Sequence, residues 1–258
     1  MDLGIAGRKA IVCASSKGLG KGCARSLALA GCEVVINGRN AEVLAATARE
    51  LAATGAMIIP VVADVSTRAG QDAILAACPD PDILVNNNGG PPPKGFRDIG
   101  REAMIDGVIQ NMITPIELVQ RVIDGMVQRG FGRIINITSA SVRTPLPGLD
   151  LSSGARAGLT AFLAGVAREV AHANVTINAI LPGAFDTDRL ASGTKRIAEQ
   201  RGVDPATVTK ERIAGIPARR LGQSDEFGEL CAFLASQQAG YITGQSVLID
   251  GGAFRTVF

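Results

Sequence analysis

A glycine-rich turn near the amino terminus is the first stretch of the chain whose residues could do chemistry. The apolar run KAIV at residues 9–12 is followed by CASSKGLG at residues 13–20, and a stretch of helix-forming residues begins directly after it. Glycine at such a turn lets the backbone approach a pyrophosphate group, whose charge is then held by the N–H groups at the start of a helix. The turn therefore predicts a nucleotide site, although Ala14 stands where the first glycine of the pattern is expected.

Two basic residues indicate which nucleotide this turn would bind. The second apolar run ends in Asn37-Gly38-Arg39, which offers a guanidinium where an acidic residue would hold a ribose 2′-hydroxyl. Lys17 lies in the glycine-rich turn itself. Charge-assisted hydrogen bonds from Lys17 and Arg39 would suit a ribose 2′-phosphate. We expect the cofactor NADP(H) rather than NAD(H), with a solvated surface charge as the alternative interpretation of each residue taken alone.

The elements that would position these residues follow from an alternation of two patterns. Short apolar runs are found at residues 9–14, 33–37, 57–63, 82–87, 132–139, 175–181 and 246–250. Helical stretches are expected at residues 20–30, 41–53, 111–129, 152–173 and 225–235. Near-continuous apolar strands between amphipathic helices are typical of a parallel sheet covered on both faces. The chain therefore predicts an α/β fold with a doubly wound parallel sheet of about seven strands in a single domain over residues 1–258.

The loops after these strands hold the polar residues that a ligand would meet. In a doubly wound parallel sheet, ligands bind beyond the carboxyl ends of the strands. In this chain those ends carry ASSKGLG, NGRN, ADV, NNNGG, TSASVRTPLPG and LPGAFDTDRL. Segment 186–220 is long and mostly polar, with eight Lys/Arg against five Asp/Glu. We expect it to form a mobile lid over this edge, or alternatively an ordinary solvated insertion.

Several short motifs, in their order and spacing, resemble one large enzyme family. The motifs are Gly18-Leu19-Gly20, Asp64-Val65, Asn86-Asn87-Asn88-Gly89, Asn111, Ser139, Pro182-Gly183, Thr187 and the ending YITGQSVLIDGG. Together they resemble the short-chain dehydrogenase/reductase superfamily, and most of all its members similar to β-ketoacyl-acyl carrier protein reductase. The resemblance spans nearly the whole chain and implies a Rossmann-type sheet. One departure is Asn88, which replaces the alanine of the usual Asn-Asn-Ala-Gly.

The resemblance also implies which residues would contact the cofactor. Asp64 and Val65 would contact the adenine. Asn86 and Gly89 would shape the floor of the cofactor site, and the segment from Pro182 onward would position the nicotinamide. The expected cofactor-binding residues are Ser15, Lys17, Gly18, Leu19, Gly20, Arg39, Asp64, Val65, Asn86, Gly89, Pro182, Gly183 and Thr187.

The catalytic set of the family is altered in this chain. Family members use an Asn, a Ser, a Tyr and a Lys that follows the Tyr by four residues. The segment RAGLTAFLAGVAREVA fixes the register against the family, so Ser152 stands at the Tyr position and Arg156 at the Lys position. Tyr241, the only tyrosine, lies just before the last strand, where we expect a structural role. The expected catalytic residues are Asn111, Ser139, Ser152 and Arg156.

This exchange removes the usual proton donor. In the family, a phenol with a free pKa of ~10 is pushed toward ionisation by the neighbouring ammonium and gives its proton to the carbonyl oxygen. A serine hydroxyl is far less acidic and shorter, and an arginine stays protonated and cannot join a proton relay. General acid catalysis contributes ~10²–10⁴-fold, whereas positioning of the reactants is worth ~7–11 kcal/mol. Loss of the phenol therefore does not by itself mean loss of reaction.

Other titratable residues are candidates to replace the phenol as proton donor or to bind the substrate. Asp150 would serve as an acid if burial raised its pKa, although an exposed loop carboxylate is the simpler interpretation. His172, the only histidine, is expected at the edge away from the cofactor. Arg143 and Arg189 are expected in loops that flank the site, where they would bind an anionic substrate such as a carboxylate or a phosphopantetheine thioester, or be solvated.

We therefore expect an NADP(H)-dependent oxidoreductase that acts on a carbonyl, hydroxyl or related group, similar to 3-oxoacyl reductases but with an atypical active site. One alternative is a non-catalytic NADPH-binding or scaffold protein. Another is a lyase similar to halohydrin dehalogenases, relatives that pair Ser and Tyr with Arg. Arg156 and Ser139 fit that lyase, whereas Ser152 does not, and the retained Gly18-Leu19-Gly20 turn argues against a halide pocket.

Composition excludes several other classes of function. The formal charge of the 258 residues is +2, with no Trp and no run of Lys/Arg, so we expect no nucleic-acid partner. Five scattered cysteines without C-x-x-C pairs or histidine partners predict reduced thiols, no metal site and a cytoplasmic location. The apolar runs are far shorter than the ~20 residues of a membrane span, and the start of the chain does not resemble a signal peptide.

Small residues on the expected helix 152–173 predict self-association. They are Ala155, Ala157, Gly158, Ala161, Ala164 and Gly165. Small side chains permit close approach of helices, and the family commonly pairs this helix and the one that contains Asn111 across a two-fold axis. By the same resemblance, Gly251 and Gly252 would lie near a second interface. We expect a homotetramer that acts on a small-molecule substrate.

Overall fold

Seven strands form a parallel sheet in the computed structural model, which describes residues 2–255. The strands are β1 (Lys9–Val12), β2 (Glu33–Gly38), β3 (Ile58–Val62), β4 (Ile83–Asn86), β5 (Gly132–Ile137), β6 (Val175–Pro182) and β7 (Ser246–Ile249). Their order across the sheet is β3-β2-β1-β4-β5-β6-β7, so the direction of winding changes between β1 and β4. Doubly wound sheets bind ligands at this point. The prediction of a doubly wound parallel sheet of seven strands is confirmed.

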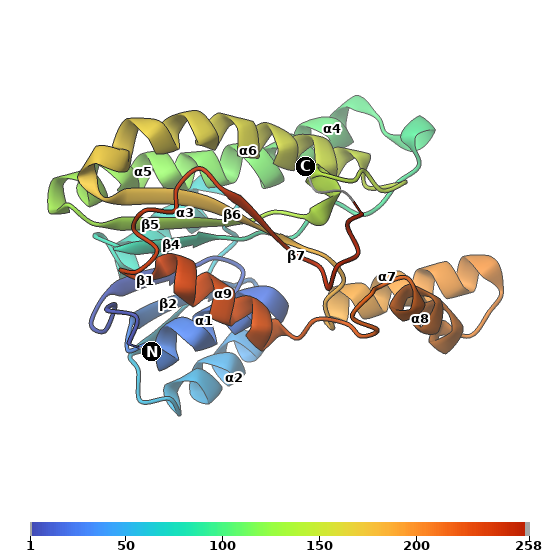
Figure 1. The fold of residues 1–258 in the computed structure, drawn as a ribbon, viewed down its shortest axis with the longest axis horizontal. Helices are drawn as coiled ribbons and strands as arrows, with labels where there is room; N and C mark the ends of the chain where they lie inside the picture. Colours follow the sequence, from blue (N-terminus) through green and yellow to red (C-terminus); the bar gives the residue numbers. More distant parts are fainter. Residues whose placement is uncertain (1, 256–258) are drawn as a thin grey trace.

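Helices cover both faces of the sheet (Figure 1). One apolar cluster joins the sheet to α1 (Gly18–Leu29), α2 (Ala41–Ala52) and α9 (Ser224–Ala235). A second cluster joins it to α3 (Arg68–Ala77), α5 (Thr114–Arg129) and α6 (Asp150–Val170). Successive residues of a strand point to opposite faces, so Val12 lies in the first cluster and Ile11 in the second. Burial on both faces explains why these strands are apolar along their whole length.

The expected helix 111–129 is longer and less regular than its sequence suggests. It is preceded by α4 (Arg101–Val108), and a π-helical turn, η2 (Ile109–Ile113), joins α4 to α5. Asn111 lies in the middle of this π turn and is buried. Single π turns inside helices are often found at functional sites, because they aim one side chain out of the regular register.

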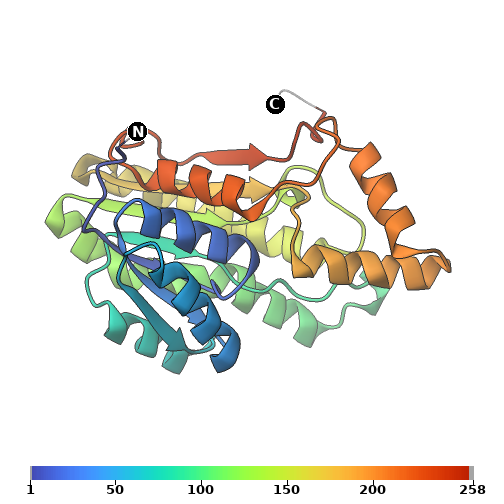
Figure 2. The same cartoon turned by 90° about the horizontal axis from the view of Figure 1, so that it is seen from below.

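Segment 186–220 folds into two helices, α7 (Asp188–Arg201) and α8 (Pro205–Ala214), that pack against each other and extend from one end of the molecule (Figure 1 and Figure 2). The Thr187 hydroxyl accepts a hydrogen bond from the Leu190 N–H and so caps the start of α7. Gly202, with a φ of +63°, ends it. Pro205 is the first residue of α8, where its missing N–H costs nothing.

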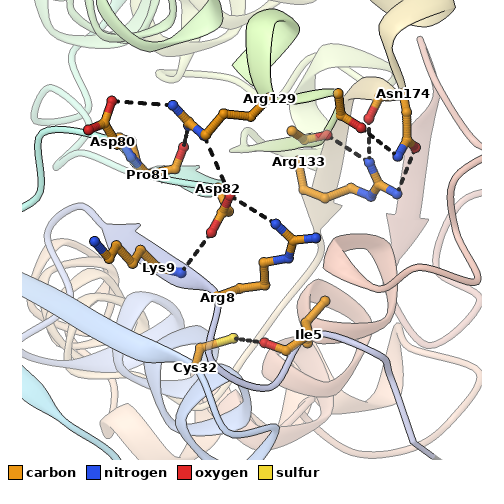
Figure 3. A network of polar contacts seen from close by, with 12 residues as sticks. Ile5, Arg8, Lys9, Cys32, Asp80, Pro81, Asp82, Arg129, Arg133 and Asn174 are labelled. Carbon is orange, nitrogen blue, oxygen red and sulfur yellow. Dashed lines mark hydrogen bonds and ion pairs between the residues drawn. The ribbon is translucent and has the colours of Figure 1, made fainter. Parts of the chain in front are cut away.

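A polar network joins the amino ends of the central strands, at the edge of the sheet opposite to the carboxyl ends of the strands (Figure 3). The Asp82 carboxylate accepts hydrogen bonds from Arg8 Nη1 at 3.2 Å and from the Lys9 N–H at 3.1 Å. Arg133 is buried, so its guanidinium donates to main-chain carbonyls, that of Ser236 among them. The Arg8 and Arg133 guanidiniums lie 3.9 and 4.3 Å from the centre of the Phe131 ring. We interpret this network as structural.

The described residues contain neither a membrane-spanning helix nor a cluster of metal ligands. None of their helices combines the length and the apolar character that a membrane crossing requires. Within residues 2–255, no three or more His, Cys, Asp or Glu side chains are grouped as metal ligands would be.

Candidate active site at the carboxyl edge of the sheet

The start of α1 offers free N–H groups at the end of β1. Lys17 is the N-cap residue, its backbone is extended, and its side chain makes no capping hydrogen bond. Gly18, the first residue of the helix, has a φ of +56°, a conformation that favours glycine. The first amides of a helix without a side-chain cap, together with the helix dipole, form a favourable site for an anion. This end of the site fits the pyrophosphate of a dinucleotide.

Ala14 adopts a left-handed backbone conformation, which glycine enters without strain. Its φ is +44°, in the left-handed region that L-residues other than Gly, Asn and Asp seldom enter. The conformation is held from both sides, because the Ala14 N–H donates to Asn37 Oδ1 at 2.8 Å and its carbonyl accepts from Asn87 Nδ2 at 3.1 Å. The turn therefore keeps its shape at the cost of an unfavourable alanine.

Ser15 also belongs to the framework of this turn. Its hydroxyl is buried, donates to the Val12 carbonyl at 2.6 Å and accepts from the Asn37 N–H at 3.0 Å. These bonds tie the ends of β1 and β2 together. The hydroxyl that sequence reasoning placed among the cofactor ligands is thus engaged within the protein, and Leu19 and Gly20 follow in the first turn of α1.

The two basic residues expected at the 2′-phosphate are both in exposed ion pairs. Lys17 Nζ lies 3.0 Å from Asp188 Oδ2, which joins the glycine-rich turn to α7. Arg39 Nη1 lies 3.8 Å from Asp64 Oδ2, and its side chain is 80% exposed. The pKa of Asp64 is lowered, first by the hydrogen bond from the Ser66 hydroxyl and also by the Arg39 charge. Exposed pairs of this kind contribute only ~0–1 kcal/mol, so a phosphate can replace the carboxylate as partner.

The loop after β4 forms one wall of the site. Asn86 Nδ2 donates to Asn136 Oδ1 at 3.0 Å, whereas the buried Asn86 Oδ1 has no partner among the described residues. Asn88 Nδ2 donates to the Gln110 carbonyl at 3.1 Å and so ties the loop to the π turn. A side chain at Gly89 would meet nothing within 4 Å, so the surface of this loop is open to a ligand. The arrangement fits a cofactor that lies along it.

The loop after β6 forms the facing wall. The Gly183 N–H donates to the Ile249 carbonyl at 2.9 Å, and a Cβ at Gly183 would lie 2.6 Å from Cβ of Asp250. Gly183 therefore lets the loop after Pro182 approach the end of β7 closely. The methyl group of Thr187 lies 3.5 Å from the position of a Cβ on Gly18, so the start of α7 lies beside the glycine-rich turn.

Ser152 and Arg156 lie one turn apart on the same face of α6. Arg156 Nη1 donates a hydrogen bond to Ser152 Oγ, and Ser152 is buried. Arg156 lines a cavity that is partly open to solvent, together with Val65, Asn86, Asn88 and Asn111. The structure thus brings three of the four expected catalytic residues to one place.

Asn111 and Ser139 keep their expected positions in the fold. Asn111 Nδ2 donates to the Gly107 carbonyl at 3.3 Å from within the π turn. Ser139 follows β5 and caps the short turn η3 (Ala140–Val142), which packs against α6. Its hydroxyl accepts from the Ser141 N–H at 3.1 Å and the Ser141 hydroxyl at 2.9 Å. The Ser139 hydroxyl therefore still has its own proton to donate.

Burial and a second arginine change the electrostatics of Arg156. Burial, and then the positive charge of Arg189, lower the Arg156 pKa to about 10. Burial also lowers the pKa of Arg189. A methyl group at Gly90 would lie 2.5 Å from Nη2 of Arg189, so this guanidinium rests on the loop beside Gly89. Both arginines remain cations at neutral pH, and they act as hydrogen-bond donors rather than as acids.

The other candidate groups do not line this cavity. Asp150 is exposed at the start of α6, and Tyr241 is completely exposed. His172 is exposed in η4 (Ala171–Ala173), at the far end of α6, with Nδ1 2.9 Å from the Glu169 carbonyl. Arg143 donates to the Ser246 carbonyl at 3.0 Å and lies over the Phe254 ring.

Sequence reasoning gave no role to Asn88, whose side chain joins the loop after β4 to the π turn. The only signal in the chain was its departure from the alanine of the family pattern. Alanine could not reach the Gln110 carbonyl, which lies within the π turn where regular helical bonding is interrupted.

Comparison with known proteins places this geometry in a family. A family model described as enoyl-(acyl carrier protein) reductase matches residues 13–253. The NADPH-dependent reductase BacG of Bacillus subtilis is 32% identical over 256 residues, which cover 97% of this chain and 99% of the relative. The 3-oxoacyl-[acyl-carrier-protein] reductase FabG of Pseudomonas aeruginosa is 32% identical over 257 residues, which cover 98% of this chain and 99% of the relative.

Solved structures of reductases share the whole fold. The structure of YwfH, an NADPH-dependent reductase involved in bacilysin biosynthesis, has a TM-score of 0.91 at 30% identity and covers 98% of this chain and 100% of that one. L-sorbose reductase from Gluconobacter frateurii, complexed with NADPH and L-sorbose, has a TM-score of 0.93 at 28% identity, with both chains covered completely.

Proposed function

Because this chain belongs to the short-chain dehydrogenase/reductase superfamily, we propose that it is an NADP(H)-dependent oxidoreductase acting on a carbonyl or hydroxyl group. Its activity is similar to that of 3-oxoacyl reductases, with an altered active site. The observation that carries this proposal is the cofactor edge, where the start of α1 has no side-chain cap and the loop after β4 is open at Gly89. Relatives whose names specify NADPH support the choice of cofactor.

Different residues of the cofactor edge bind different parts of the cofactor. The first amides of α1, from Gly18 onward, hold the pyrophosphate. Lys17 and Arg39 exchange their carboxylate partners for the 2′-phosphate. Asp64 and Val65 border the adenine, and the Gly89 loop and the segment Pro182–Thr187 enclose the nicotinamide. When bound, NADPH supplies the hydride that reduces a carbonyl carbon.

Arg156 and Ser139 take over the stabilisation of the oxygen. As the carbonyl carbon accepts hydride, negative charge develops on its oxygen, and donors aimed at that oxygen lower the barrier. Arg156, held in place by Ser152, donates to this oxygen together with the Ser139 hydroxyl. Its pKa of about 10 keeps the guanidinium charged at neutral pH. The proton that completes the alcohol comes from solvent water, which enters through the open side of the cavity beside Asn111.

Two further assignments belong to this proposal. Residues 1–258 form one NAD(P)-binding domain in which α7 and α8 act as a lid over the carboxyl edge. The Lys17–Asp188 pair joins this lid to the glycine-rich turn until Lys17 binds the 2′-phosphate. The protein acts as a homotetramer, with α6 at one interface. The exposed apolar side chains of Met104 and Ile105 on α4 and of Phe162 on α6 support this assembly.

Calorimetric titration with NADPH and NADH tests the proposal directly. We expect NADPH to bind more tightly, and we expect a panel of ketones, β-ketoesters and oxo acids to contain a compound whose addition consumes NADPH. Binding of NADPH without turnover of any carbonyl would favour the non-catalytic alternative. Failure of either nucleotide to bind would refute the assignment of the cofactor edge.

A further inference from the structure

Arg156 and Arg189 are two cations that border the same loop, residues 86–90, which follows β4. Neither takes part in an ion pair among residues 2–255, and the side-chain hydrogen bond of Arg156 goes to the neutral Ser152. The charge of Arg189 acts on Arg156, so the two guanidiniums are close enough to repel each other. Arg156 is half-buried whereas Arg189 is exposed, so a bound anion would relieve the repulsion on Arg156 most of all.

The fold holds this pair in place from two separate elements. Arg156 projects from α6 into the cavity that Asn88 and Asn111 also line. Arg189 lies in the first turn of α7, and its guanidinium rests on the backbone of Gly90, where any side chain would displace it. The loop 86–90 therefore borders both guanidiniums, because Asn88 lines the cavity with Arg156 and Gly90 contacts Arg189.

The anions of the cofactor already have other partners in the proposed binding mode. The pyrophosphate lies at the start of α1, and the 2′-phosphate lies near Lys17 and Arg39, beyond the end of β2. Arg156 lines the cavity together with Asn111, whereas Lys17 and Arg39 do not line it. An anion bound between Arg156 and Arg189 would thus belong to the substrate.

We propose that Arg156 and Arg189 bind the carboxylate of the substrate, so that the substrates are oxo acids with a free carboxylate close to the reacting carbonyl. This inference rests on the proposed function, because it places that carboxylate beside the carbonyl that accepts hydride. The planar fork of a guanidinium matches the two oxygens of a carboxylate. A neutral ketone or an ester would leave the two cations uncompensated, which gives the site its preference.

The chemistry of the exchange at positions 152 and 156 agrees with such a substrate. The pair of cations holds the carboxylate and lowers the cost of a second negative charge on the nearby carbonyl oxygen. Hydride adds to the carbonyl carbon, the electron pair of the C=O bond moves to oxygen, and water supplies the proton. Electrostatic stabilisation of the carbonyl oxygen thereby replaces part of the rate acceleration that the phenol would provide.

Matched pairs of oxo acids and their methyl esters test this inference. Each ester keeps the reacting carbonyl and lacks only the charge. The panel contains 2-oxo and 3-oxo acids, with malonate as a non-reacting dicarboxylate, titrated by calorimetry into the protein saturated with NADPH. We expect the acids to bind and turn over at least ~10-fold better than their esters, since a charge-assisted hydrogen bond contributes ~1.5–3 kcal/mol.

Two variants and two controls assign the effect to these side chains. Arg156→Gln and Arg189→Gln should each weaken malonate binding about 10-fold or more and leave the affinity for NADPH within a factor of about 3. Arg168→Gln, on an exposed part of α6, and Lys195→Gln, on an exposed part of α7, should change neither. Lys195 and Arg168 keep each comparison within one helix.

Three results would overturn the inference. The first is that esters bind as well as acids, and the second is that no dicarboxylate or oxo acid binds. The third is that Arg189→Gln weakens NADPH as much as malonate, which would mean that the pair holds a phosphate of the cofactor. The proposed function fails separately, when the unaltered protein does not bind NADPH at all.

Discussion

Restoring the tyrosine and the lysine of the family should convert this site toward ordinary ketone reduction, but only when both are introduced. Ser152 is buried and its Oγ receives a hydrogen bond from Arg156, so a phenol at position 152 would have to occupy the space that the guanidinium now fills. Ser152→Tyr alone should therefore lower the free energy of unfolding by ~1–3 kcal/mol, the usual cost of overpacking. Arg156→Lys removes the bulky end of that side chain and makes room.

The gain in rate follows from the role of each group. With Lys at 156, an ammonium lowers the pKa of the phenol, and the phenol then donates its proton to the carbonyl oxygen. General acid catalysis is worth ~10²–10⁴-fold, so we expect the double variant to reduce a neutral β-ketoester at least ~10² faster than the unaltered protein. Either change alone should give a far smaller gain in the rate of reduction, because the two groups act as a unit.

Steady-state consumption of NADPH by the four proteins is the assay, with NADPH affinity measured for each as a control for folding. The same set should show the opposite trend with an oxo acid, because Arg156→Lys removes the planar fork. The reasoning is wrong if the unaltered protein already reduces β-ketoesters at the rate of the double variant. It is equally wrong if the double variant binds NADPH normally and gains no activity.

Three further predictions concern the cofactor edge and the anion site. Ala14→Gly should raise the free energy of unfolding by about 1 kcal/mol, a rise of ~2–4 °C in Tm, because it relieves a left-handed alanine; an unchanged Tm by calorimetry would mean that the turn carries no strain. Arg39→Ala should reduce the preference for NADPH over NADH about 10-fold, as measured by titration with both nucleotides, and an unchanged ratio would leave Lys17 as the only 2′-phosphate residue. Malonate binding should be constant from neutral to mildly alkaline pH and weaken as the pH rises through about 10, since Arg156 loses its proton there; a decline that sets in near neutrality would assign the anion site to a different group.

The sheet could be predicted from the sequence because its strands are buried on both faces. Continuous apolar runs such as ILVN and GRIINI have one simple interpretation in a chain of this length. Sequence reasoning missed four helices, of which the short α3 buries Ile74 and the other three, α4, α7 and α8, lack such a signal. Helix α4 exposes Met104 and Ile105 and buries only Gly107, and α7 and α8 bury few side chains between them. Side-chain caps and the Arg201–Glu211 ion pair stabilise α7 and α8 instead, and such interactions produce no periodic apolar pattern in the sequence.

The sequence predicts which residues form the site better than it predicts which of them contact one another. Register against the family identified Ser152 and Arg156, and helical spacing of four residues already placed them on one face. Contacts between distant segments could not be found in this way. Lys17 and Asp188 are 171 positions apart, and the contact of Arg189 with Gly90 depends on where the start of α7 lies. Such contacts are set by tertiary packing, which single-sequence patterns do not encode.

The changes at positions 152 and 156 are best explained as one remodelling of the site rather than as two independent losses. Loss of a buried phenol alone would leave a cavity and an unpaired buried ammonium, both of which are costly. Here the smaller Ser152 accompanies the larger Arg156, and the two are joined by a hydrogen bond. The remaining uncompensated charge lies on Arg156, which lines the cavity, and on Arg189, which contacts Gly90 in the loop beside it. A site that had merely decayed would have no reason to keep two cations beside one loop, whereas a site for an anionic substrate requires them.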